Sequence, residues 1–117
     1  MTGSTPATAY KVLTADQMIA LEAGIFAGAP IDLADGYIHM STRDQLTETV
    51  DKHFAGQSGL WVAAVDLDAL GDAVKWEVSR GGAEFPHLYG QLTLETVIAY
   101  SPLEREEDGT VRLPVTG

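Results

Sequence analysis

Hydrophobic and polar positions follow a pattern that predicts several short strands with two helices near the N-terminus. Most of the strand segments are rich in β-branched and aromatic residues, which suit a pleated sheet. One of them, LWVAAVDL, is almost continuously apolar, as in a strand buried on both faces. A proline near the C-terminus is tolerated only on an edge strand. We therefore expect strands at residues 9–13, 37–40, 60–67, 74–78 and 96–103, and an edge strand at 111–115.

The first helix is expected directly after the first strand. Thr14 and Gln17 have the spacing of a capping box, in which each side chain bonds the backbone N–H of the other residue. The apolar stripe that follows is partial, and Gly24 or Gly28 is expected to end the helix. Residues 29–35 contain a proline and two aspartates, and we expect them to be irregular.

The second helix has the stronger signal. Thr42 and Gln45 repeat the capping pattern. The apolar residues that follow recur at every fourth position, which places them on one face of a helix from Arg43 to Ala55; they are Leu46, Val50 and Phe54. Five or six strands with two early helices indicate an α+β fold.

Length and composition indicate one globular domain, residues 1–117, with a loose N-terminal tail at residues 1–8. Hydrophobic residues make up 45% of the chain and charged residues 21%, which argues against disorder. No apolar run is long enough to span a membrane, and no secretory signal is apparent. The absence of cysteine excludes disulfides, thiolate catalysis and cysteine-based zinc sites. We expect a cytoplasmic protein.

The charge balance argues against nucleic acid as a partner. Seven basic residues face 17 acidic ones, for a formal net charge of −10, and the basic residues are scattered. Binding a phosphate backbone requires clustered Lys and Arg, so DNA is excluded and RNA is disfavoured. A single arginine can still hold one phosphate or carboxylate, so a small anionic ligand remains open. The sequence does not indicate a particular protein partner.

The stretch from Trp76 to Gly90, WEVSRGGAEFPHLYG, is the most unusual part of the chain. It mixes three aromatic rings with ionisable side chains, three glycines and a proline. This composition favours a shaped, semi-rigid loop that lines a cleft. A second segment, DGYIHMST at residues 35–42, is the expected partner of this loop.

His39 and Ser41 are the candidate site residues of the second segment. Strand alternation places them on one face, where together they can hydrogen-bond a ligand hydroxyl or phosphate. The alternative is structural: His39 bonds a backbone carbonyl in the core, and Ser41 caps the next helix.

Arg80, Gly81 and Gly82 are candidates for anion binding, because a guanidinium beside exposed backbone N–H groups suits a phosphate. The alternative is a tight turn with a solvated Arg80 that pairs with Glu77.

His87 and Tyr89 belong to the segment FPHLYG. Pro86 restricts the preceding residue to an extended conformation, and Gly90 permits a turn. An aromatic side chain here could stack on a flat ring of a ligand while His87 transfers a proton. The alternative is a packed loop that closes one end of the sheet.

Two kinds of site are disfavoured by spacing. His39, His87 and Glu77 lack the short intervals of a metal motif, so no metal is expected. No G-x-S-x-G elbow presents a serine nucleophile.

Three runs together resemble a known bacterial family: DGYIHMST, HFAGQ and WEVSRGGAEFPHLYG. The family is called "domain of unknown function 952", and the resemblance extends from Tyr10 to about Leu103.

The resemblance implies an ADP-ribosyltransferase-like fold, with two small, mostly antiparallel sheets around a dinucleotide cleft and two or three helices. It also implies a relationship to RNA 2′-phosphotransferases and NAD as the cofactor. By this analogy His39 contacts a ribose with Ser41 beside it, and His87 is a second histidine of the site. The residues implied to line the cleft are Trp76, Arg80 and Tyr89. The catalytic Glu of such enzymes has three candidates here, Glu77, Glu84 and Glu95.

Three functions remain open from the sequence. The first is an ADP-ribosyltransferase-like domain that binds a dinucleotide or ADP-ribose-type ligand, as a transferase or phosphotransferase acting on a small molecule. The second is a non-catalytic nucleotide or small-molecule binding module. The third is a structural or protein-interaction domain.

Overall fold

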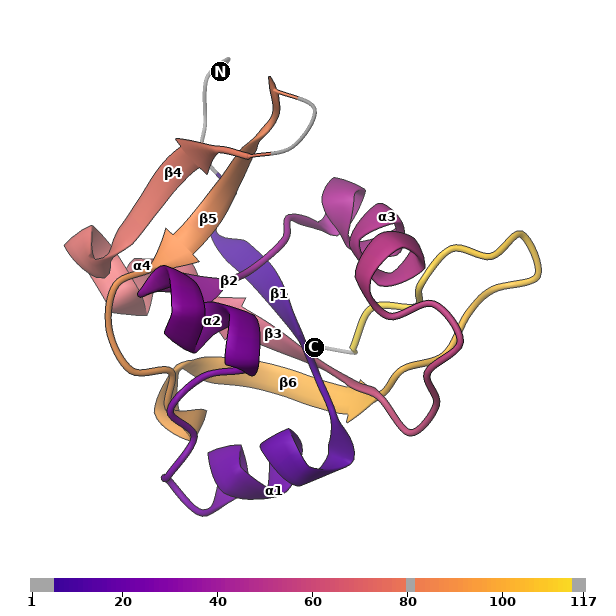
Figure 1. Cartoon of the computed structure of the whole chain (residues 1–117), viewed down its shortest axis with the longest axis horizontal. Helices are drawn as coiled ribbons and strands as arrows, with labels where there is room; N and C mark the ends of the chain where they lie inside the picture. The colour runs from indigo at the N-terminus through magenta and orange to yellow at the C-terminus, as the bar shows by residue number, and fades with distance from the viewer. Residues whose placement is uncertain (1–5, 80–81, 115–117) are drawn as a thin grey trace.

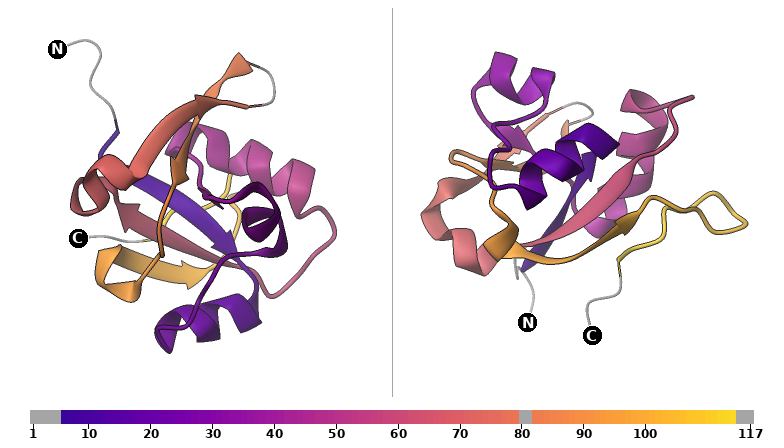
Figure 2. Two further views of the ribbon diagram at one scale, coloured as in Figure 1. Left: turned by 60° about the vertical axis from the view of Figure 1, so that its left-hand side comes forward. Right: turned by 90° about the horizontal axis from the view of Figure 1, so that it is seen from below.

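Two small antiparallel sheets form the centre of an α+β fold (Figures 1 and 2). The structure is a computed structural model that describes residues 6–79 and 82–114. The first sheet has the strand order β1-β3-β6, and the second has the order β2-β5-β4. Their bounds are β1 Thr8–Leu13, β3 Trp61–Asp66 and β6 Val97–Pro102 in the first sheet, and β2 Ile38–His39, β5 Glu84–Leu88 and β4 Val74–Val78 in the second.

Four α-helices are found within the described ranges, where two or three were expected. The additional ones are short: two of the four have only six and four residues, too few for an apolar stripe to show in the sequence. The helices are α1 Ala15–Glu22, α2 Pro30–Asp35, α3 Arg43–His53 and α4 Leu67–Leu70, and single 3₁₀ turns follow at η1 Gly71–Ala73 and η3 Leu94–Thr96.

Both predicted capping boxes are confirmed. The Thr14 hydroxyl accepts the Gln17 N–H at 3.2 Å, and the Gln17 side chain accepts the Thr14 N–H at 2.9 Å. Thr42 and Gln45 make the same exchange at 3.3 and 3.0 Å at the start of α3. These bonds satisfy backbone donors that the first turn of a helix leaves unpaired.

The central strand β3 of the first sheet is buried on both faces, as its apolar run predicted. Residues 62–65 of this central strand are fully buried. One face packs into a core with the second sheet, and the other packs against α3 around Leu46 and Val50. Ile38, Met40 and Leu88 bring the second sheet into the shared core. By alternation, His39 and His87 lie on the opposite face of that sheet.

The chain passes from one sheet to the other just after β2. Met40 donates its N–H to the Pro86 carbonyl of β5, at 3.1 Å. The next residue, Ser41, exchanges two backbone hydrogen bonds with Tyr10 of β1, at 2.7 and 2.9 Å. The predicted strand at residues 37–40 is shortened to Ile38–His39, and the chain turns to the first sheet directly after Met40.

Residues 29–35, expected to be irregular, form α2 instead. Pro30 stands in the first helical turn, where its missing N–H costs nothing. The Asp32 carboxylate accepts the Ala29 N–H at 2.8 Å and so caps the helix from inside. Gly36 ends it with φ of +86°, which a glycine adopts without strain. Figure 1 shows α2 lying in front of β2.

The stretch from Trp76 to Gly90 is largely a β-hairpin, and the prediction of a loop was wrong. Residues 76–78 belong to β4 and residues 84–88 to β5, paired in register from Val74↔Leu88 to Val78↔Glu84. The mixture of rings and ionisable groups arises because one face of the hairpin packs into the core while the other carries the polar side chains.

Two smaller expectations also need correction. The turn expected at residues 68–72 contains part of α4 and the 3₁₀ turn η1. In place of an edge strand near the C-terminus, Val111 forms an isolated bridge with Arg105, and Val115 lies outside the described residues. In residues 6–79 and 82–114, no helix has the length and apolar character needed to cross a membrane.

Leu88→Ala is expected to lower the free energy of unfolding by about 3 kcal/mol, because its side chain lies fully inside the core shared by the sheets. Ile98→Ala on β6, where the side chain is 46% exposed, is the matched control and should cost less than about 1 kcal/mol. Urea unfolding monitored by circular dichroism measures both. Equal losses would contradict this placement of the core.

Candidate functional site

Two histidines face each other on neighbouring strands of the second sheet. His39 of β2 is the register partner of His87 of β5. Their ring centroids are 5.4 Å apart, with the rings tilted edge to face at 64°. The sequence singled out both residues, and strand pairing brings them together from positions far apart in the chain.

Two tyrosines extend this cluster. The ring of Tyr37 stacks on His87, with centroids 4.1 Å apart and 23° between the planes, and lies 4.7 Å from the ring of His39. Tyr89 lies 5.2 Å from Tyr37. Sequence analysis proposed Tyr89 but missed Tyr37, although its position two residues before His39 on an alternating segment was the available signal.

Asp32 holds His39 from the buried side. Its carboxylate is almost completely buried and accepts both the backbone N–H of His39, at 3.0 Å, and the Nδ1 of the ring, at 2.7 Å. Burial raises the pKa of Asp32, but the hydrogen bond from His39 and the charge of Lys11 outweigh it, and the pKa falls to about 2.

Lys11 supplies the compensating charge. It extends from the middle of β1, is buried, and places Nζ 2.9 Å from Asp32 Oδ2 and 3.1 Å from Oδ1. Burial lowers the pKa of Lys11, and the carboxylate in contact opposes that fall. Sequence analysis missed both residues. The lysine in an otherwise apolar strand, AYKVL, was the signal, since an isolated buried lysine requires a partner.

Asp35 holds the outer nitrogen of His39. Its Oδ2 lies 2.9 Å from Nε2, and the carboxylate is 43% exposed at the end of α2. His39 therefore has a carboxylate oxygen in hydrogen-bonding distance of each ring nitrogen. Only a ring with a proton on both nitrogens can donate both bonds.

Glu77 of β4 performs the corresponding role for His87. Its Oε1 accepts from Nδ1 of the buried ring at 2.7 Å and from the Tyr89 hydroxyl at 2.8 Å. The hydrogen bond from His87, then that from Tyr89, lowers the pKa of Glu77. In turn, the hydrogen bond to Glu77 raises the pKa of Tyr89. Of the three glutamates considered from sequence, Glu77 contacts a histidine, whereas Glu84 at the start of β5 and Glu95 in η3 are exposed.

Several residues proposed from sequence lie elsewhere. Ser41 is buried and its hydroxyl hydrogen-bonds that of Thr49 on α3, at 2.8 Å, so it serves the junction between β2 and α3. Trp76 is half-buried and packs against the core between the sheets.

Of the three residues proposed for anion binding, the structure describes only Gly82. Arg80 and Gly81 lie outside the described residues. Gly82 is exposed with φ of +79°, and its N–H donates to the Ser79 carbonyl at 3.2 Å. This bond belongs to the turn that joins β4 to β5.

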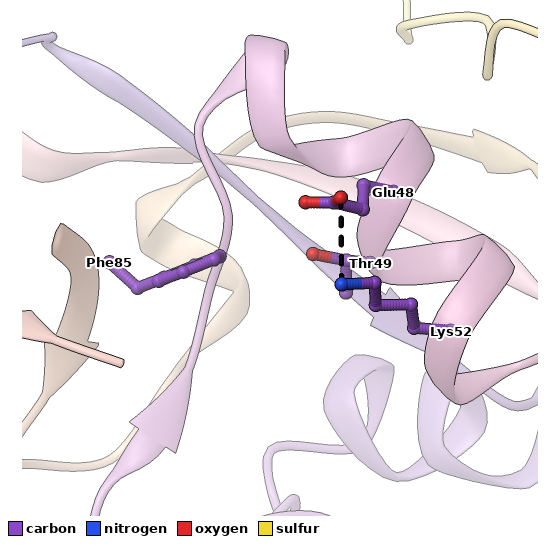
Figure 3. Close-up of a pocket in the computed structure, with 4 residues that line it drawn as sticks. All are labelled: Glu48, Thr49, Lys52 and Phe85. Atoms are coloured by element: carbon purple, nitrogen blue, oxygen red, sulfur yellow. Dashed lines mark ion pairs between the residues drawn. The ribbon is translucent and has the colours of Figure 1, made fainter. Parts of the chain in front are cut away.

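A shallow pocket lies between α3 and β5, and its lining includes neither histidine of the cluster (Figure 3). It is lined by Glu48, Thr49 and Lys52 of α3 and by Phe85 of β5, and encloses about 220 Å³ of space that is partly open to solvent. Lys52 and Glu48, one turn apart on α3, form an ion pair of 3.6 Å. In the part of the chain that the structure describes, no three His, Asp or Glu side chains are arranged to bind a metal ion.

Comparison with family models decides the family. The model described as "Protein of unknown function (DUF952)" matches residues 12–100. The chain belongs to this family. Lys11 lies just outside the matched range, whereas the two histidines and the residues in contact with them lie within it: Asp32, Asp35, Tyr37, Glu77 and Tyr89.

Solved structures of a bacterial relative share the fold. The crystal structure of CC0527 from Caulobacter crescentus is 44% identical, with a TM-score of 0.81, and the match covers 91% of this chain and 94% of that one. The solution NMR structure of CC0527 is also 44% identical, with a TM-score of 0.76 and 91% coverage of both chains. No curated protein matches the sequence.

Asp32→Asn is expected to lower the free energy of unfolding by about 3 kcal/mol at neutral pH, because it leaves the Lys11 ammonium buried without a countercharge. Combining it with Lys11→Met should restore much of this loss. A double-mutant cycle in urea measures the coupling. Additive losses in the cycle would contradict a functional ion pair between these two side chains.

The wild-type protein should also lose stability in acid through Asp32. Its pKa in the folded protein, about 2, lies below the ordinary value of 3.8, so its contribution is complete above pH 4 and is lost as the pH falls toward 2. Across this range wild type should lose about 2 kcal/mol more than Asp32→Asn. Denaturant unfolding at successive pH values tests this, and parallel pH profiles would count against it.

Proposed function

We propose that this protein is an ADP-ribosyltransferase-like domain that binds a dinucleotide or ADP-ribose-type ligand at the His39–His87 cluster. It acts as a transferase or phosphotransferase on a small molecule, with NAD as the candidate cofactor. The observation that carries the proposal is the pair of imidazole rings 5.4 Å apart, each in contact with a carboxylate. Such pairs are a recurring means of acid–base catalysis.

The two histidines have different roles in this proposal. His87 has Nδ1 engaged by Glu77, which leaves Nε2 as the nitrogen that exchanges a proton with the ligand. His39 has carboxylates at both nitrogens and acts as a fixed positive charge next to the reacting group. In this arrangement His87 exchanges a proton and His39 keeps a positive charge. Both suit the transfer of a group that develops charge in the transition state.

Glu77 is our candidate for the carboxylate that ADP-ribosyltransferase-like enzymes use to stabilise a ribose with oxocarbenium character. It stands in contact with His87 and Tyr89, and its hydrogen bonds favour the ionised form. An ionised carboxylate beside the reaction centre can stabilise a developing positive charge through space.

The tyrosines replace the tryptophan as the proposed stacking surface. Tyr37 already covers one histidine ring, and Tyr89 is 41% exposed beside it. A flat ring such as nicotinamide or adenine can stack on a phenol face. Trp76 is not part of this proposal because it packs in the core.

A non-catalytic binding module is the second candidate. The observation that favours it is that carboxylates of the protein already occupy three ring nitrogens of the two histidines. In that case the cluster recognises the ligand without transferring a proton to it. The two candidates differ in whether a chemical product forms.

NAD or ADP-ribose is expected to raise the melting temperature of the wild-type protein by several degrees at millimolar concentration, because a ligand that binds only the folded state stabilises it. His87→Ala and His39→Ala should each abolish the shift. His53→Ala, at the exposed end of α3, is the matched histidine control and should retain it. Nicotinamide and inorganic phosphate identify which part of the ligand contributes.

Product formation separates the two candidates. Chromatography of the same mixtures should reveal a new product with the wild-type protein and none with His87→Ala or Glu77→Gln, whereas Glu107→Gln, an exposed carboxylate elsewhere, should be active. A shift without product supports the binding module. If no nucleotide shifts the melting temperature of a well-folded sample, the proposal is wrong.

A further inference from the structure

Asp32 and Asp35 hold opposite sides of the same histidine in very different ways. Asp32 is buried and also bonds Lys11 and two backbone N–H groups, so it cannot leave without exposing unpaired polar groups. Asp35 is 43% exposed, and its contact with His39 spans only four residues of chain. The inner carboxylate is therefore anchored, and the outer one is replaceable by solvent or ligand.

The outer nitrogen of His39 is the donor that an incoming anion would use. With Nδ1 directed at Asp32, Nε2 is the only ring nitrogen on the solvent side, and it is the one that Asp35 Oδ2 contacts at 2.9 Å. A carboxylate oxygen at this distance has the geometry and charge of a phosphate oxygen in a charge-assisted hydrogen bond.

We propose that Asp35 is a specificity-determining residue whose carboxylate occupies the position of a ligand phosphate oxygen on His39 Nε2. A phosphate-bearing ligand binds there only by displacing Asp35, which restricts the site to ligands whose remaining contacts offset that displacement. This inference rests on the proposed function, because it assumes that the ligand of the cluster carries phosphate.

The charges around His39 support this competition. Lys11 is already paired with Asp32, and Glu77 is engaged by His87 and Tyr89. Asp35 therefore opposes an entering anion in two ways, because it uses the Nε2 donor and adds a negative charge at close range. Tyr37 and His87, packed against His39, contribute aromatic rings rather than carboxylates to its surroundings.

Inorganic phosphate and pyrophosphate are the probes of choice, because they isolate the phosphate contact from the rest of a nucleotide. Asp35→Asn keeps the shape of the side chain and removes its charge. It is expected to bind either probe roughly tenfold more tightly than wild type, by the loss of one competing charge-assisted hydrogen bond. NMR titration of the histidine ring signals at neutral pH measures the affinity and shows whether His39 responds.

Two further variants serve as controls for the Asp35→Asn result. Asp16→Asn removes one exposed carboxylate from the first turn of α1 and controls for net charge, so it should bind phosphate as wild type does. His39→Ala in the Asp35→Asn background should abolish the gain. If Asp35→Asn does not fold, Asp35→Ala provides the same comparison.

The outcomes separate this inference from the proposed function. Equal or weaker phosphate binding by Asp35→Asn, or no detectable binding by either protein, overturns the role of Asp35. A gain with phosphate supports that role even if no dinucleotide binds, in which case the proposed ligand is wrong. Binding of NAD or ADP-ribose that Asp35→Asn leaves unchanged supports the proposed function and contradicts the competition.

Discussion

The buried ion pair between Lys11 and Asp32 is the interaction on which the candidate site depends. It connects β1 of the first sheet to α2, which contacts β2 of the second, so one pair of charges ties together three elements. Two ions are stable in a protein interior only when their attraction and hydrogen bonds offset the loss of water. Asp32 meets this condition through Lys11, the N–H groups of residues 29 and 39, and the ring of His39. The orientation of His39 is thus fixed by the same contacts that hold α2 in place.

Local signals in the sequence predicted most of the elements. Both capping boxes and the apolar run of β3 were recognisable because they depend on residues close together in the chain. α2 was missed because six residues provide no periodicity, and because its aspartates resembled those of a loop. The partner that compensates the burial of Asp32, Lys11, is 21 residues away in the sequence and could not be assigned from local signals.

The site itself was predicted only in part. His39 and His87 were recognised as unusual residues in strand-like segments, and their pairing follows from the register of β2 with β5. Their supporting carboxylates could not be assigned, because which aspartate or glutamate faces a histidine depends on strand order and helix packing. Trp76 and Ser41 were also proposed for the site, but their contacts could not be read from sequence: Trp76 packs against the core, and the Ser41 hydroxyl hydrogen-bonds Thr49.

The protonation of the two histidines tests the account most directly. Nitrogen-15 NMR of the ring atoms at neutral pH should show His39 with a proton on both nitrogens, held between Asp32 and Asp35, and His87 with a single proton on Nδ1, directed at Glu77. This result would support a fixed charge beside a proton-transferring group. A neutral His39, or a His87 that carries its proton on Nε2, would contradict the division of labour on which the proposed function depends.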